Sequence, residues 1–244
     1  LTAEGEIFYR YAREIVRRYE EMQHRIQALG SVVSGTVRLS SIYSMGMLEL
    51  APYLKTYIKA YPKVNFRLEY THAPKIYDDV ASSEIDLGIV AYPRAQRNVD
   101  VIQFSEDQMV LICNPSRSLA KIESIQPKQL EGHPLILFTP ETPTRRAIDR
   151  FFRKHGVRPD VVMELDHITT LVHAVEVDIG VSIVPSPAVE QHRSAETLRA
   201  IPFQGEPFVR PLGILYRRGR SLSVATQKLL GVLAGEEQAL PTSD

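Results

Sequence analysis

Hydroxyl-bearing side chains follow three predicted strands of this sequence, at the points where each strand gives way to a helical pattern. The three groups are Ser40, Ser41 and Ser44; Thr139 and Thr142; and Thr169 and Thr170. Hydroxyl groups and the free backbone N–H groups of a helix N-terminus can together hold a small polar or anionic molecule. Each group taken alone could equally be an ordinary helix cap. Because ligands in open α/β sheets bind beyond the carboxyl ends of the strands, three such turns favour one shared ligand cleft.

A run of basic residues follows the second group and begins with Arg145 and Arg146. Arg145 would lie in the first turn of a helix opened by Thr142 and Pro143, because threonine is a good N-cap and proline a good first helical residue. From there its guanidinium group could contact an anionic ligand. The run could also be the solvent-facing side of that helix, and the sequence leaves both interpretations open.

Motifs of catalysis and metal binding are missing from the sequence. There is no G-x-G-x-x-G, P-loop, G-x-S-x-G or H-E-x-x-H pattern. Residues 118–121 match S-x-x-K, but the companion elements of that motif are absent. The seven histidines are scattered, and His167 and His173 do not share a helical face. We therefore expect neither an enzyme nor a metal or other cofactor site.

The composition is that of an ordinary globular protein. The 244 residues are 44% hydrophobic and 24% charged, and the formal net charge is zero. A neutral chain has no general attraction for nucleic acid or for anionic membranes. No transmembrane run or export signal is predicted, so we expect no membrane partner and a cytoplasmic location. The single cysteine, Cys113, lies in an apolar run and is expected to be a buried thiol.

Strand and helix patterns alternate along the chain. Val37 and Leu39 alternate with polar neighbours, as residues of a half-buried strand do. The strands are expected near residues 37–39, 64–70, 86–90, 109–113, 134–138, 161–165, 180–185 and 208–216. Helical patterns separate most of them, and a last helical pattern spans 222–233. This alternation predicts two α/β units with parallel strands and right-handed crossovers.

A regular apolar stripe runs through the first thirty residues. Its members, spaced alternately by four and three, are Phe8, Ala12, Ile15, Tyr19, Met22, Ile26 and Leu29. This spacing predicts a helix of about three heptads that ends at Gly30. The stripe could pack on its own domain or on a second copy. A short linker separates this helix from the rest of the chain, which favours contact with a second copy.

Several stretches of the chain resemble the LysR-type transcriptional regulators. The matching stretches are residues 1–5 (LTAEG), 35–39 (GTVRL), 61–64 (YPKV) and 85–89 (IDLGI). The resemblance covers nearly the whole chain and implies a linker and dimerisation helix at residues 1–30. Two Rossmann-like subdomains similar to type 2 periplasmic binding proteins would follow. Residues 36–104 with 206–235 would form subdomain I, and residues 105–205 subdomain II.

The resemblance also implies a function. The chain would be the effector-binding region of a ligand-responsive regulator, working as a homodimer or homotetramer. It would reach DNA only through a winged helix-turn-helix domain just upstream of Leu1. Carried over residue by residue, the effector contacts would fall on Ser41, Ile42, Tyr43, Thr71, Thr139, Pro140, Thr142 and Thr169. One departure is that the family pattern Ala-Gly-x-Gly is Val-Asp-Ile-Gly here, at residues 177–180.

Two alternatives come from other functional classes. A stand-alone solute-binding protein of the same fold would need an export signal and would have no use for a dimerising helix. An enzyme on this fold would need convergent acid, base or nucleophile motifs. We therefore expect a regulator that senses a small polar or anionic metabolite.

Overall fold

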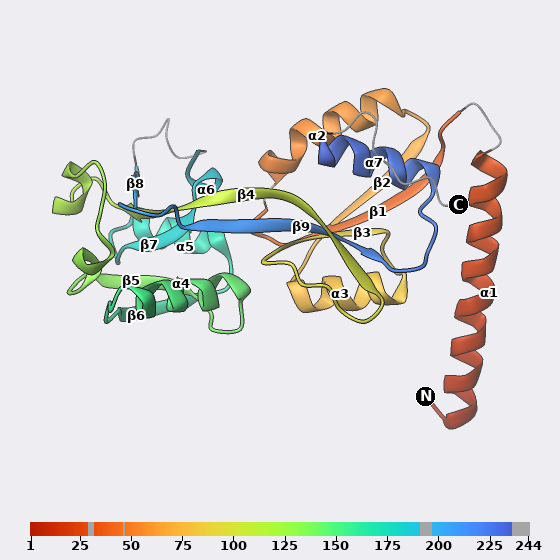
Figure 1. Ribbon diagram of the computed structural model, residues 1–244, viewed down its shortest axis with the longest axis horizontal. Helices are drawn as coiled ribbons and strands as arrows, with labels where there is room; N and C mark the ends of the chain where they lie inside the picture. Colours follow the sequence, from red (N-terminus) through yellow and green to blue (C-terminus); the bar gives the residue numbers. More distant parts are fainter. Residues whose placement is uncertain (29–31, 46, 191–196, 236–244) are drawn as a thin grey trace.

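The computed structural model describes residues 1–28, 32–45, 47–190 and 197–235. It shows two α/β lobes lying end to end, with a separate long helix beside the first lobe (Figure 1). The predicted α/β architecture with a preceding helix is therefore confirmed.

Lobe I is built on parallel strands covered by helices on both faces (Figure 1). Its elements are β1 (Gly35–Ser41), α2 (Met47–Ala60), β2 (Val64–Tyr70), α3 (Ala73–Ser82), β3 (Leu87–Ala91) and α7 (Val224–Ala234). β1 lies between β2 and β3 and pairs with both in parallel. Val37 and Leu39 are buried, as their alternation with polar residues predicted. The Tyr57 hydroxyl of α2 donates a hydrogen bond to the Ala225 carbonyl of α7 at 2.8 Å, which joins the two helices on one face.

Lobe II contains a second set of strands and helices. Its elements are β5 (Pro134–Phe138), α4 (Pro143–Lys154), β6 (Asp160–Leu165), α5 (Ile168–Glu176), β7 (Ser182–Pro185), α6 (Pro187–Glu190) and β8 (Arg199–Pro202), with 3-10 turns η1 (Ser118–Lys121) and η2 (Pro127–Leu130). β5 pairs in parallel with β6. The Thr142 hydroxyl accepts the Arg145 N–H at 3.1 Å, so the predicted cap of α4 is confirmed.

Two long strands, β4 (Val99–Cys113) and β9 (Val209–Arg217), run from one lobe into the other (Figure 1). The first part of β4 pairs antiparallel with β9, with a register shift between Gln103 and Ser105. From Met109 onward β4 pairs with β7 and β8 instead. The sequence predicted a strand only from Met109, and this was too short. Polar residues interrupt the apolar pattern of residues 99–108, although the backbone there remains part of the sheet.

Helix α1 (Ala3–Ala28) lies beside lobe I and exposes its apolar stripe (Figure 1). Phe8 is 75% exposed, Ile15 69% and Ile26 60%. Tyr19 and Met22 are also exposed, whereas Leu29 and Gly30 fall outside the described residues. On its other side, Arg13 donates a hydrogen bond to the Ser82 carbonyl of lobe I. In the described parts of the chain, no helix combines the length and apolar character that a membrane span needs.

Cys113 ends β4 and is completely buried. Burial raises the pKa of its thiol, and the nearby Arg117 and Arg199 offset only part of this. A raised pKa means less thiolate, which is the reactive form. We expect native Cys113 to react with iodoacetamide on the order of 100-fold more slowly than in the unfolded chain. Alkylation followed by mass spectrometry, with and without denaturant, measures this. Equal rates in both conditions would contradict the buried position.

Candidate functional site

The turns that follow β1, β2, β5 and β6, together with the end of β3, line one cavity between the lobes. Its lining includes Ile42, Tyr43, Ser44, Thr71, His72, Ala73 and Ala91 from lobe I and Phe138, Thr142, Pro143, Thr144 and Asp166 from lobe II. Helices α2, α3, α4 and α5 all begin just after these turns. Their N-termini therefore contribute partial positive charge on the cavity side. Strand ends and helix starts thus form the walls, as open α/β sheets arrange them.

The cavity is small. Its volume is about 60 Å³, which is room for a few water molecules. Part of the closure comes from a cluster of rings. The Tyr43 ring of lobe I lies 4.3 Å from the His167 ring of lobe II and 5.3 Å from the His72 ring. These ring contacts connect the lobes across the cavity, so an organic ligand requires the lobes or the rings to move.

Two largely buried threonines line this cavity, one from each lobe. Thr71 is 8% exposed and belongs to lobe I, and Thr144 is 6% exposed and belongs to lobe II. Within the described part of the chain, neither side chain has a hydrogen-bond partner. Each hydroxyl oxygen keeps some accessible surface, because neither is among the enclosed side-chain oxygens that lack a partner in the described residues. A ligand in the cavity that accepts a hydrogen bond from each hydroxyl group would take the place of water there.

Other predicted residues take structural roles. Thr142 lines the cavity, but its hydroxyl group donates to the Thr139 carbonyl at 3.0 Å while it caps α4. Ser41 is completely buried in β1, and Pro140 is exposed in the turn before α4. Neither these two residues nor Thr139 lies in the cavity lining. Thr169 is exposed in the first turn of α5, two positions after His167.

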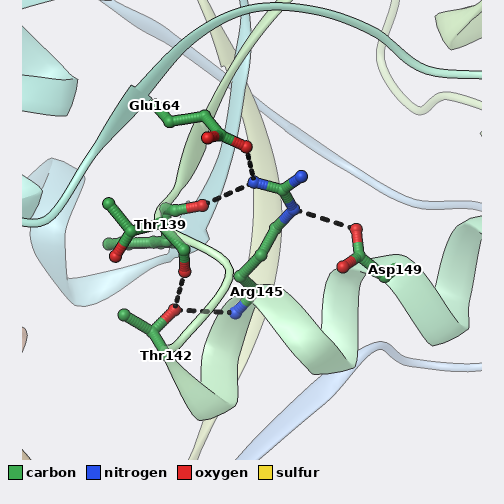
Figure 2. A network of polar contacts seen from close by, with 6 residues as sticks. Thr139, Thr142, Arg145, Asp149 and Glu164 are labelled. Carbon is green, nitrogen blue, oxygen red and sulfur yellow. Dashed lines mark hydrogen bonds and ion pairs between the residues drawn. The ribbon is translucent and has the colours of Figure 1, made fainter.

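Arg145 is held within lobe II by three hydrogen bonds (Figure 2). Its Nε donates to Asp149 at 2.9 Å, and its Nη1 donates to Glu164 at 2.6 Å and to the Phe138 carbonyl at 2.7 Å. The residue is only 9% exposed and does not line the cavity. For Arg145 itself both interpretations were wrong, because its guanidinium neither faces solvent nor contacts the cavity. It joins α4 to β5 and β6. The other members of the basic run do face solvent, as one interpretation predicted: Arg146, Arg150, Arg153, Lys154 and Arg158 are exposed.

The sequence patterns did not indicate His72 and Thr144, which line the cavity, or His167, whose ring contacts Tyr43 beside it. His72 and His167 are the N-cap residues of α3 and α5, yet neither side chain caps its helix. A histidine at that position is unusual, because capping needs a short side chain with an oxygen acceptor. That signal was available in the sequence. Thr144 gave no such signal, since it lies inside a helical pattern.

The LysR substrate binding domain family matches residues 30–238. The chain belongs to this family. Among curated relatives, the uncharacterized HTH-type transcriptional regulator YybE of Bacillus subtilis is 25% identical over 91% of this chain and 75% of its own length. The HTH-type transcriptional activator CmpR of Synechocystis is 23% identical over 98% of this chain and 79% of its own length.

Solved structures share the LysR fold. The effector-binding domain of QuiR, in complex with shikimate, is 20% identical with a TM-score of 0.75. The regulatory domain of CcmR from Synechocystis, in complex with 2-PG, is 24% identical with a TM-score of 0.76. Each comparison covers 83% of this chain and 97% of the other chain. The chain is thus the effector-binding region of a LysR-type transcriptional regulator, rather than a stand-alone solute-binding protein.

Proposed function

We propose that the cavity between the lobes is the effector site and that it takes a small molecule with an anionic group. One observation carries this proposal: two largely buried threonines, Thr71 and Thr144, line the cavity from opposite lobes, and their hydroxyl groups have no partner among the described residues. The helix N-termini around the cavity favour negative charge. The complexes of QuiR with shikimate and of CcmR with 2-PG support the same class of ligand.

We propose that the ligand acts by shifting the population of lobe arrangements. The described cavity of about 60 Å³ has room for a few water molecules, so an organic acid would need a more open arrangement of the lobes. The ligand changes the balance only if it binds the open and closed arrangements with different affinities. Contact with both Thr71 and Thr144 makes its affinity depend on the distance between the lobes.

The first test replaces Thr71 with valine, which has nearly the same shape but lacks the hydroxyl group. We expect Thr71→Val to weaken binding of shikimate or 2-PG about 10-fold, the effect of losing one hydrogen bond. Calorimetric titration of wild type and variant measures the change. Thr56→Val, on the exposed side of α2, is the matched control and should bind as wild type does. Unchanged affinity in Thr71→Val would remove this residue from the site.

Thr169 stays a prediction of the resemblance. Because it is exposed in the first turn of α5, we expect Thr169→Val to weaken binding of the same probes less than Thr71→Val does. Both variants belong in the same titration series.

We propose that the exposed stripe of α1 packs on α1 of a second copy, giving a homodimer or a higher homo-oligomer. Six apolar residues with heptad spacing, from Phe8 to Ile26, lie in the described part of this helix. Such a seam is buried when two helices wind around each other. DNA contact would belong to a winged helix-turn-helix domain preceding α1, and a regulator of transcription would work in the cytoplasm.

We propose binding rather than catalysis at this cavity. Its lining, as far as the structure describes it, combines hydroxyl groups, one histidine and one carboxylate. Among the described residues, no hydroxyl group there is hydrogen-bonded to a histidine, so an activated nucleophile is missing. Incubating the protein with either probe and recovering it unchanged would support this, and turnover would contradict it.

A further inference from the structure

A buried ion pair lies where the two crossing strands pass between the lobes. Arg210 of β9 and Asp107 of β4 are cross-strand partners. Arg210 is completely buried, and its Nε donates to the Asp107 carboxylate at 2.9 Å. Just beyond this pair, at Met109, β4 exchanges β9 for β7 as its partner. The ion pair therefore sits at the junction about which the lobes would move.

The same arginine holds the loop between β1 and α2. Its Nη1 donates to the Ser44 hydroxyl oxygen at 2.8 Å, and its Nη2 donates to the Ser44 carbonyl at 3.3 Å. Ser44 lines the cavity between the lobes. Because the Ser44 hydroxyl oxygen accepts a hydrogen bond from Arg210, the hydroxyl proton must point in another direction. Within the described residues, that proton has no acceptor.

This arrangement suits recognition of an anion. A hydroxyl group that accepts from a guanidinium is polarised, which makes its own O–H a stronger donor. Asp107 balances the charge of Arg210. The guanidinium therefore affects the cavity through its hydrogen bonds to Ser44. A buried ion pair adds little stability compared with an apolar pair of similar size. The effect of the ion pair on Ser44 gives it a function other than stabilising the fold.

We propose that Arg210 is a positioning residue of the effector site, which holds Ser44 so that its O–H donates to the anionic group of the ligand. The proposal rests on the proposed function of the cavity and adds a residue that does not itself line it. Arg210 also joins Ser44, the residue proposed to contact the ligand, to β4 and β9 at the junction of the lobes.

The test separates this role from a purely structural one. Removing Arg210 alone would leave Asp107 buried and unpaired, so the main variant is the apolar pair Arg210→Met with Asp107→Leu, which should remain folded. Titration with shikimate and 2-PG should show about 10-fold weaker binding than wild type. Ser44→Ala should show a similar loss. The variant with all three changes should bind no more weakly than either parent, because both act through one hydroxyl group.

The outcomes are distinct. Wild-type affinity in a folded Arg210→Met/Asp107→Leu variant, or fully additive losses with Ser44→Ala, would overturn the role of Arg210. If Thr71→Val weakens binding and Ser44→Ala does not, the proposed function stands and this inference fails. If wild type binds neither probe, both fail. Should the apolar pair not fold, the same cycle is run with Arg210→Lys, which keeps the charge but loses the fork that holds Ser44.

Discussion

Replacing Arg145 with methionine is expected to lower the free energy of unfolding by about 2 kcal/mol. The Phe138 carbonyl loses its donor inside lobe II, where Phe138 is only 3% exposed. Asp149 and Glu164 also lose their partner, but their side chains are 32% and 42% exposed, so water replaces much of that interaction. Burial alone would lower the pKa of Arg145, yet hydrogen bonds to Glu164 and Asp149 raise it, so the charge persists at every working pH.

Urea unfolding followed by circular dichroism measures this change. Arg146→Met is the matched control, because Arg146 is the exposed neighbour on the same helix and its side chain, among the described residues, donates only to the Glu141 carbonyl. Its effect should stay within about 0.5 kcal/mol. Folded Arg145→Met should bind shikimate or 2-PG as wild type does. Weaker binding with unchanged stability would return Arg145 to the effector site.

Ile15→Glu is expected to weaken self-association at least about 100-fold, equal to about 2.7 kcal/mol. Ile15 lies in the middle of the α1 stripe and is 69% exposed in the single chain. In a dimer the substitution occurs in both copies, and each glutamate would carry its charge into an apolar seam. Glutamate is a good helix former, so α1 itself should persist.

Sedimentation over a range of concentrations measures the change. Arg10→Glu is the control, because it introduces the same residue on the opposite, exposed side of α1. It should associate as wild type does. A wild-type chain that remains a monomer at high concentration, or equal association of both variants, would contradict the dimer seam.

Local patterns predicted most of the secondary structure. The alternation of residues 64–70 predicted β2, which is observed as Val64–Tyr70. Thr142 and Pro143 predicted the start of α4, because capping depends on residues three positions apart. Both signals are contained in a few neighbouring residues, so no knowledge of tertiary structure is needed to detect them.

Local patterns could not predict contacts between residues that lie far apart in the sequence. The partner of Asp107 is Arg210, which lies 103 positions away. The continuity of β4 depends on β9 in the same manner. For Arg145, the sequence indicated the helix but not the acidic partner Glu164 on β6. The direction of the Arg145 side chain could therefore not be predicted. Of the residues predicted for effector contact, Ile42, Tyr43, Thr71 and Thr142 line the cavity.

The turn before β7 shows how a departure from the family pattern is accommodated. Gly180, the glycine that the chain keeps, has no room for a side chain, because a Cβ atom would lie 2.6 Å from the Pro134 carbonyl oxygen. Asp178 takes the place of the other glycine and adopts a positive φ of 62°. Aspartate tolerates that conformation better than most residues. Its carboxylate also pairs with Arg117.

The position of β9 has a consequence for biosynthesis. In the sheet order β2-β1-β3-β9-β4, the strand made last lies between strands made much earlier. Lobe I therefore lacks an inner strand until residues 209–217 have left the ribosome, whereas most of lobe II has already been translated by then. We expect lobe II to fold first on the nascent chain. The place between β3 and the first part of β4 should stay unfilled until β9 is inserted there.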